Sequence, residues 1–292
     1  MTHNKNTSPF RYHPEDQLRI FRSSTNKFRL TEDERIILEG IHRSIVITPM
    51  LLLDQLSAPG ISTGIQNLQL NLHHLFNRGF LNKLSLEDPD GCTPPQTIYA
   101  LSKAYLRSLE ETPEKLDLLL CKRLLATQQY LGAAGHYRSA SAVTMNARIT
   151  EPDTRPGFFS DHTFRCDALI RDPDGQTTFV LAIRKEKNWL EKLKEQLSTM
   201  ERTIFSPCPL NVPTKDSRII LICEDEDHQT ELEQALIRDQ TCRYEFPVFV
   251  DNDIQTFSRM SSGPALIPAL KKSLAQQVSG RMLNCIETAL KM

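Results

Sequence analysis

The sequence has no long hydrophobic run and no closely spaced cysteine pair. None of its apolar stretches approaches the ~20 residues that a membrane-spanning helix needs, so we expect no membrane span. Residues 1–18 also lack the apolar centre of a secretory signal. The seven cysteines are scattered without a CxxC pair, which argues against a disulfide framework or a structural zinc site. These absences predict a cytoplasmic protein with reduced thiols.

Common catalytic motifs and a basic charge balance are absent as well. The sequence contains no phosphate-binding glycine loop, no nucleophile elbow and no HExxH motif. Its 35 lysines and arginines are balanced by 36 acidic residues, so the net charge of −1 gives no general argument for nucleic-acid binding. A chain of 292 residues with 39% hydrophobic residues is typical of a globular protein of about two domains. Its function must therefore be inferred from local features.

The first 30 residues differ in composition from the rest and are predicted to form a basic, flexible arm. They contain six lysines and arginines against two acidic residues. Two interpretations remain open: a solvated tail, or an arm that reaches toward DNA phosphates. Order is expected from Thr31 onward, because Thr31 and Glu34 form a capping box that starts a helix.

Residues 31–111 contain three predicted helices and a β-hairpin, with Ser62 or Thr63 as the cap of the third helix. The predicted elements are, in order, helices over 32–44, 49–58 and 63–78, strands over 80–86 and 97–101, and a helix over 103–110. This order, with the segments LFNRGFLNKL and TIYALSKAYLRSL, resembles a winged helix-turn-helix domain. Tyr99 and Leu101 match the returning strand of the wing.

The resemblance implies that the third helix reads the major groove of double-stranded DNA. Projection at about 100° per residue places its apolar stripe at Leu68 and Leu72, which leaves the opposite face for DNA. Glutamine and asparagine can pair with adenine edges, and basic side chains can hold phosphates. The predicted DNA contacts are Thr63, Gln66, Asn67, Leu70, His74, Asn77 and Arg78 on the helix, and Lys83 on the first hairpin strand.

The charge of this region limits the expected affinity for DNA. Residues 31–110 carry six basic and nine acidic side chains, whereas phosphate contacts normally supply most non-specific affinity. We therefore expect weak binding that depends on the basic arm or on a homodimer. A winged helix that binds a protein in place of DNA remains an alternative.

A linker over 112–138 is predicted to carry a helix that starts at Thr112-Pro113-Glu114 and connects two domains. Residues 139–292 then change to strands joined by crossover helices, which predicts an α/β layer with partly parallel strands. The predicted elements are strands over 142–149, 164–171 and 177–185, a helix over 189–203, a strand over 218–223, a helix over 226–238, a strand over 244–250 and helices over 264–291. The acidic run 224–227 is expected to cap the helix that follows it. The whole chain is thus predicted to be an α+β protein.

The order of hairpin, helix and strand in this half resembles the core of PD-(D/E)xK nucleases. The resemblance implies Mg²⁺ held by an aspartate on the second strand and by an acid-x-lysine triplet on the third. Asp167 matches that aspartate, but Ala182 and Arg184 replace the acid and the lysine of the triplet. Glu186, two residues farther along the chain, is a candidate for a relocated ligand. We expect a vestigial site without metal or catalysis; the alternative is an active Mg²⁺-dependent DNA endonuclease.

The two domains together, over residues 31–250, resemble the plasmid replication-relaxation family. This resemblance implies a DNA-binding accessory or regulatory protein in plasmid or mobile-element replication, mobilisation or transcription control. The second domain would then be a scaffold. The implied partners are double-stranded DNA, a replication or relaxase protein and a second copy of the chain, with no resident cofactor. Ala182 departs from the acid that this family carries on the third strand, so inherited cleavage is not expected.

Overall fold

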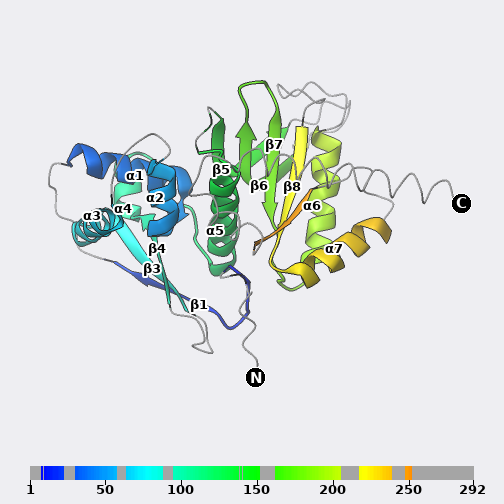
Figure 1. Cartoon of the computed structure of the whole chain (residues 1–292), viewed down its shortest axis with the longest axis horizontal. Helices are drawn as coiled ribbons and strands as arrows, with labels where there is room; N and C mark the ends of the chain where they lie inside the picture. The colour runs from blue at the N-terminus through cyan, green and yellow to red at the C-terminus, as the bar shows by residue number, and fades with distance from the viewer. Residues whose placement is uncertain are drawn as a thin grey trace, which may run out of the picture.

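The computed structural model describes residues 8, 10–22, 30–57, 64–87, 95–137, 139, 141–151, 162–204, 217–238 and 247–251. They form the α+β structure that the sequence predicts, with two sheets. Figure 1 shows these sheets on either side of a central helix, α5 (Leu118–Ala133). Of the described helices, none combines the length and the apolar composition that a bilayer crossing requires.

Four helices lie in the N-terminal half: α1 (Glu32–Ser44), α2 (Pro49–Ser57), α3 (Ile65–Asn77) and α4 (Lys103–Ser108). The capping box that starts α1 is confirmed, because Thr31 Oγ1 accepts the Glu34 N–H at 3.2 Å and Glu34 Oε2 accepts the Thr31 N–H at 2.8 Å. The N-cap of α3 is Gly64, whereas the predicted caps Ser62 and Thr63 lie outside the described residues.

The apolar sides of α1, α2 and α3 meet in one core together with one face of a sheet. Leu68 and Leu72 of α3 are fully buried there, as their helical spacing predicts. Gly40 of α1 lets α2 approach closely, since a Cβ atom at this position would lie 2.9 Å from Leu52 Cδ1.

Gly40→Ala is therefore expected to lower the free energy of unfolding by about 1–3 kcal/mol, because the new methyl group would crowd the fully buried Leu52 side chain. Gly132→Ala in α5 is the matched control. Its new methyl group would meet Tyr137 at 3.9 Å, an ordinary contact, and alanine in a helix is up to about 1 kcal/mol more stable than glycine. Urea unfolding measures both variants. Equal effects at the two positions would contradict this close contact between α1 and α2.

The first sheet has four antiparallel strands in the order β1-β3-β4-β2. The predicted hairpin is present as β3 (Leu81–Glu87) and β4 (Gln96–Leu101), and its turn at 88–91 lies outside the described residues. Two strands were not predicted: β2 (Val46–Ile47), between α1 and α2, and β1 (Gln17–Phe21), from the N-terminal segment. Ser102 caps α4 as expected, and its hydroxyl also donates to the Gly79 carbonyl at 2.7 Å.

Residues 10–22 differ from the flexible arm that the sequence predicts. Strand β1 pairs with β3 and forms the edge of the first sheet, and Phe10 is 3% exposed within the core around α5. Lys122 of α5 donates hydrogen bonds to the Asp16 carboxylate and to the Arg11 carbonyl. The sequence of this polar segment does not reveal these contacts, because the residues that it contacts all lie far away in the chain. The described part of the arm is a fixed strap across the molecule.

Helix α5 is the centre of the molecule and corrects the predicted linker. It begins after Asp117, whose Oδ1 accepts the Leu120 N–H at 2.8 Å, and not at Thr112. Both of its sides are buried, because it lies between the two sheets (Figure 1). The shared core contains residues from the first sheet, from α5 and from the second sheet, namely Val46, Leu84, Ile98, Leu124, Leu125, Leu131, Met145, Ile170, Val180 and Ile222.

The second sheet has the order β5-β6-β7-β8-β9, antiparallel from β5 to β7 and parallel from β7 to β9. The partly parallel layer is therefore confirmed. Helices α6 and α7 cover the face opposite to α5 (Figure 1). The element bounds are β5 (Ala142–Glu151), β6 (His162–Arg171), β7 (Thr177–Ala182), α6 (Trp189–Ile204), β8 (Ser217–Cys223), α7 (Glu226–Arg238) and β9 (Val248–Val250). The predicted helices over 264–291 and residues 244–246 of the last predicted strand lie outside the described residues.

Candidate functional site

The outer face of α3 presents most of the side chains that the sequence predicts for DNA. Gln66, Asn67, His74 and Asn77 are exposed, and Leu70 is 54% exposed. The leucines on the opposite face of the helix are fully buried in the helical core. The helical projection therefore identified the exposed side of α3 correctly.

Helix α3 contains no acidic residue, and its N-terminus has no side-chain cap. Free N–H groups at a helix N-terminus favour a phosphate, because the helix dipole is positive there. In the described part of the chain, Gln66 and Asn67 make no side-chain hydrogen bond, so their amides are available to a partner. Asn77 differs, since its Nδ2 lies 2.9 Å from His73 Nε2. The available amides thus lie in the N-terminal part of the helix.

Arg78 is held by the fold and does not extend from the helix as a phosphate contact. Its Nη1 donates to Glu34 Oε1 at 2.5 Å, and the two side chains are 18% and 7% exposed. Its guanidinium carbon also lies 5.1 Å from the centroid of the Phe80 ring. Arg78 therefore connects the end of α3 to the start of α1, and we remove it from the predicted DNA contacts. Its position in the sequence correctly placed Arg78 at the edge of the exposed face of α3, but it did not reveal the ion pair with Glu34.

Lys83 is half-buried on β3, opposite Phe21 of β1 and Tyr99 of β4. Successive side chains of a strand alternate between faces, so Lys83 shares a face with Leu81. Leu81 and Tyr99 belong to the core that contains α3. Lys83 thus lies on the same side of the first sheet as the exposed helix face.

In the second half of the chain, Asp167 and Ala182 are neighbours. Asp167 is fully buried on β6, and its Oδ2 accepts the Ala182 N–H at 2.7 Å. Its Oδ1 lies 2.8 Å from Arg123 Nη2 of α5. The Asp167 carboxylate, beside Arg123, raises the pKa of the guanidinium and keeps it charged. The sequence prediction missed Arg123, although two adjacent basic residues, Lys122 and Arg123, in a helix without acidic residues are a signal for acidic partners elsewhere in the chain.

The other predicted residues of the vestigial site do not gather around Asp167 as metal ligands. Glu186 pairs with Lys192 of α6 at 2.5 Å, and Arg184 turns toward Asp251, with Nη2 at 3.1 Å from Asp251 Oδ2. Within the described ranges, no group of three or more His, Cys, Asp or Glu side chains is arranged to hold a metal ion. Arg123 supplies the positive charge beside Asp167.

A second buried polar cluster lies at the carboxyl ends of the parallel strands, the edge at which α/β sheets commonly bind ligands. Arg184 follows β7, Glu224 follows β8 and Asp251 follows β9; all three side chains are at most 1% exposed. Arg184 Nη1 also donates to the Ile183 carbonyl at 2.7 Å. His228 of α7 is fully buried beside them, and its backbone N–H is capped by Asp225 Oδ1 at 2.7 Å.

The N-terminal strap closes this cluster. Ser8 donates to Asp251 Oδ2, and the Tyr12 N–H donates to Glu224 Oε1 at 2.7 Å. Burial raises the pKa of Glu224 and of Asp251, while Arg184 opposes both shifts. The helix-capping prediction is met by Asp225 but is wrong for Glu224, which is fully buried and accepts the Tyr12 N–H. The available signal was a carboxylate directly after the apolar run at 219–223. The closed geometry favours a structural role for the cluster.

His228 makes this region sensitive to acid. Burial, with Lys185 and Arg184 nearby, lowers its pKa to about 3, while Asp225 opposes the shift. The unfolded chain binds a proton near pH 6.5 and the folded chain does not, so this histidine costs about 2 kcal/mol of stability between pH 7 and pH 5. The pKa values of Glu224 and Asp251 are raised, so these two carboxyl groups have the opposite effect on stability as the pH falls. We expect His228→Gln to lose less stability than the wild type over this pH range in urea unfolding. Parallel pH profiles of the two proteins would rule this out.

No protein-family model, curated protein or solved structure matches this chain. What the chain does is therefore inferred from its own residues. The exposed face of α3 carries no acidic residue, whereas Asp167, Arg184 and Glu224 in the second half of the chain are buried.

Proposed function

We propose that this chain is a DNA-binding accessory or regulatory protein that places α3 in the major groove of double-stranded DNA. The observation that carries the proposal is the outer face of α3. Gln66 and Asn67 are exposed there and have no side-chain hydrogen-bond partner among the described residues, and the other face of the helix is buried in a core. Amide side chains of this kind pair with base edges, and Leu70, about one helical turn farther along α3, suits a thymine methyl group.

The arrangement around α3 supports a winged helix-turn-helix domain. The chain runs through α1, β2, α2 and α3 and then into the hairpin of β3 and β4. The short strand β2 pairs with β4, so the hairpin is fixed to the helices that it follows. Helix-turn-helix domains use the second helix of the pair for recognition, which corresponds here to α3. Lys83 on the α3 side of the sheet is the candidate phosphate contact of the hairpin.

The order of elements in the second half supports a nuclease-like scaffold that does not cleave. Helix α5, the antiparallel strands β5 to β7, helix α6 and the parallel strand β8 follow one another in the order expected of that fold. Arg123 forms an ion pair with Asp167, so the position beside this carboxylate already holds a cation. We propose that this domain is a scaffold for a replication or relaxase protein or for a second copy of the chain, in the cytoplasm.

Fluorescence anisotropy on fragments of the chain's own replicon, over a salt series, tests the proposal. We expect one fragment to bind more tightly than the others. Gln66→Ala with Asn67→Ala should weaken that complex by at least about tenfold, because each good base contact contributes roughly 1–3 kcal/mol. The slope of affinity against salt should stay unchanged, because phosphate contacts set it.

Gln234→Ala is the matched control, since it removes an exposed amide from α7, on the far side of the molecule. It should bind DNA like the wild type. If no fragment binds at low salt, the chain is not a DNA-binding protein and a protein-binding winged helix becomes the better account. If the double variant binds like the wild type, α3 is not the recognition helix.

A further inference from the structure

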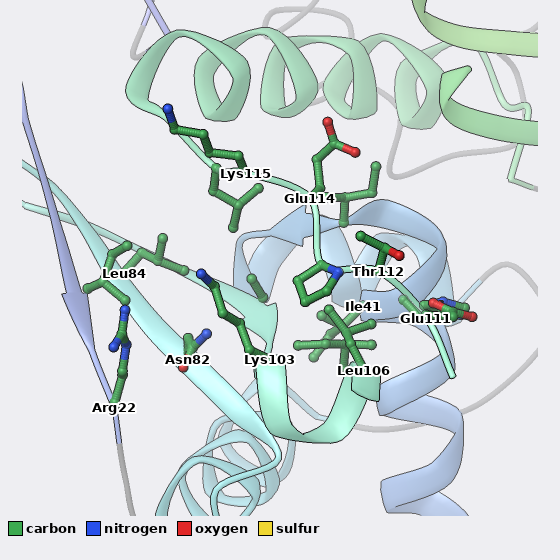
Figure 2. Close-up of a pocket in the computed structure, with 17 residues that line it drawn as sticks. Arg22, Ile41, Asn82, Leu84, Lys103, Leu106, Glu111, Thr112, Glu114 and Lys115 are labelled. Carbon is green, nitrogen blue, oxygen red and sulfur yellow. The ribbon is translucent and has the colours of Figure 1, made fainter. Parts of the chain in front are cut away.

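A cavity of about 280 Å³ lies between the first sheet and the segment that leads into α5. Its floor is apolar and consists of buried side chains from α1, β3 and β4. Its wall is the non-helical stretch over 111–116, which the sequence predicts to start a helix (Figure 2). The apolar side chains that line it are Ile20, Ile41, Ile45, Leu84, Ala100, Leu101, Leu106, Pro113 and Leu116.

The wall of this cavity is held at both ends. Glu111 Oε2 lies 2.7 Å from His42 Nε2 of α1, and Glu114 Oε1 lies 3.4 Å from Arg165 Nη1 of β6. Each acidic side chain of the lining is therefore already paired with a basic side chain. The cavity is built by contacts with both halves of the molecule and is not a gap left by a loose loop.

Three cations line the cavity without an acidic partner among the described residues: Arg22, Lys103 and Lys115. They come from the end of β1, from the first residue of α4 and from the 111–116 wall. Figure 2 shows Arg22 and Lys103 on the same side of the cavity, with Asn82 between them and Thr112 on the opposite side. Basic groups above an apolar floor match a molecule that is anionic at one end and apolar at the other.

We propose that this cavity binds a small organic anion with a compact apolar body. The anionic head, a carboxylate or a phosphate, pairs with Arg22 and Lys103, and the body lies on Ile41 and Leu84. At about 280 Å³, the cavity lies near the lower end of the size range of small-molecule pockets, which suits a small ligand such as a medium-chain acid. The proposal stands on this geometry and does not depend on DNA binding.

Fluorescence of 8-anilinonaphthalene-1-sulfonate, an amphipathic anion, is the probe for this site. We expect saturable binding to the folded chain and displacement by octanoate or by hexyl phosphate; the more effective competitor identifies the head group. Octylammonium has a similar chain but a positive head and should not compete. Equal competition by octanoate and octylammonium would overturn the proposal, because the site would then select only for apolar surface.

Two variants assign the binding to this cavity. Arg22→Glu with Lys103→Glu should weaken octanoate binding by more than tenfold, because it reverses two of the three charges. Lys187→Glu changes the charge of an exposed lysine before α6 and should leave the affinity unchanged. Leu106→Trp fills the cavity from a half-buried position and should also abolish binding. Thermal unfolding of each variant confirms that it is folded; wild-type affinity in a folded Arg22/Lys103 variant contradicts the proposal.

Discussion

Replacing Arg184 by methionine is expected to lower the free energy of unfolding by about 3–5 kcal/mol. The side chains of Arg184 and Asp251 are at most 1% exposed, and they form an ion pair at 3.1 Å. Without the guanidinium, the Asp251 carboxylate stays buried with Ser8 as its hydrogen-bond donor among the described residues. The large cost arises from this uncompensated charge, not from the net stability of the pair. Urea unfolding followed by circular dichroism measures the effect.

Two further variants separate this explanation from a general loss of packing. Arg184→Met combined with Asp251→Leu removes both charges and should recover most of the lost stability, because apolar replacements of buried ion pairs are often neutral. Arg43→Met breaks the exposed pair with Glu39 and should change stability by less than about 1 kcal/mol. A double variant that is as unstable as Arg184→Met would contradict the account.

Phe10→Ala is expected to cost about 3–5 kcal/mol, the usual cost of removing a buried phenylalanine ring. Phe10 is 3% exposed in the core around α5, although the sequence around it is polar and basic. Phe21→Ala, in the same segment, is the matched control. Phe21 is 46% exposed on the edge strand β1, so its loss should cost much less than that of Phe10.

The comparison of these two phenylalanines tests whether residues 10–22 are a structural strap or a tail. A tail would tolerate both substitutions, and stability within about 0.5 kcal/mol of the wild type for Phe10→Ala would exclude the strap. A strap predicts a large difference between the two variants. Thermal unfolding at neutral pH gives the same comparison by a second method.

The elements that the sequence predicts well are those with local signals. The capping box of Thr31 and Glu34 starts α1 at the predicted residue, and the leucine spacing of α3 identifies its buried face. The predicted strands over 164–171 and 177–185 are present as β6 and β7, and the turn at 172–175 joins them, where Gly175 adopts a φ of 88°. Each of these features depends on residues that lie a few positions apart in the sequence. The sequence of that segment alone is therefore enough to predict them.

The features that the sequence did not predict depend on partners far apart in the chain. Ser8 and Asp251 are separated by 243 positions, and Arg123 and Asp167 by 44. The start of α5 was misplaced because Thr112-Pro113-Glu114 has the local chemistry of a helix start. In the fold, this stretch is held along the cavity and Asp117 takes the capping position.

The candidate recognition face was predictable in outline but not in detail. Helical projection at about 100° per residue predicts on which face of α3 each side chain lies. It correctly placed Gln66 and Asn67 on the exposed face. It gives no information on a partner from another helix. Arg78 therefore looked like a phosphate contact from the sequence, whereas Glu34 of α1 holds it.

Cleavage of DNA by an iron–EDTA group tethered to α3 tests the central proposal most directly. The group is attached at Leu70→Cys, with Leu109→Cys after α4 as the control position. Both native leucines are exposed, and Cys92, Cys208, Cys242 and Cys285 are replaced by serine in both proteins. If α3 lies in the major groove, the group at position 70 cuts the bound fragment at one short stretch of base pairs, and the group at position 109 cuts weakly or not at all. Stronger cleavage from position 109, or none from position 70 on a bound fragment, would show that α3 is not the element that contacts DNA.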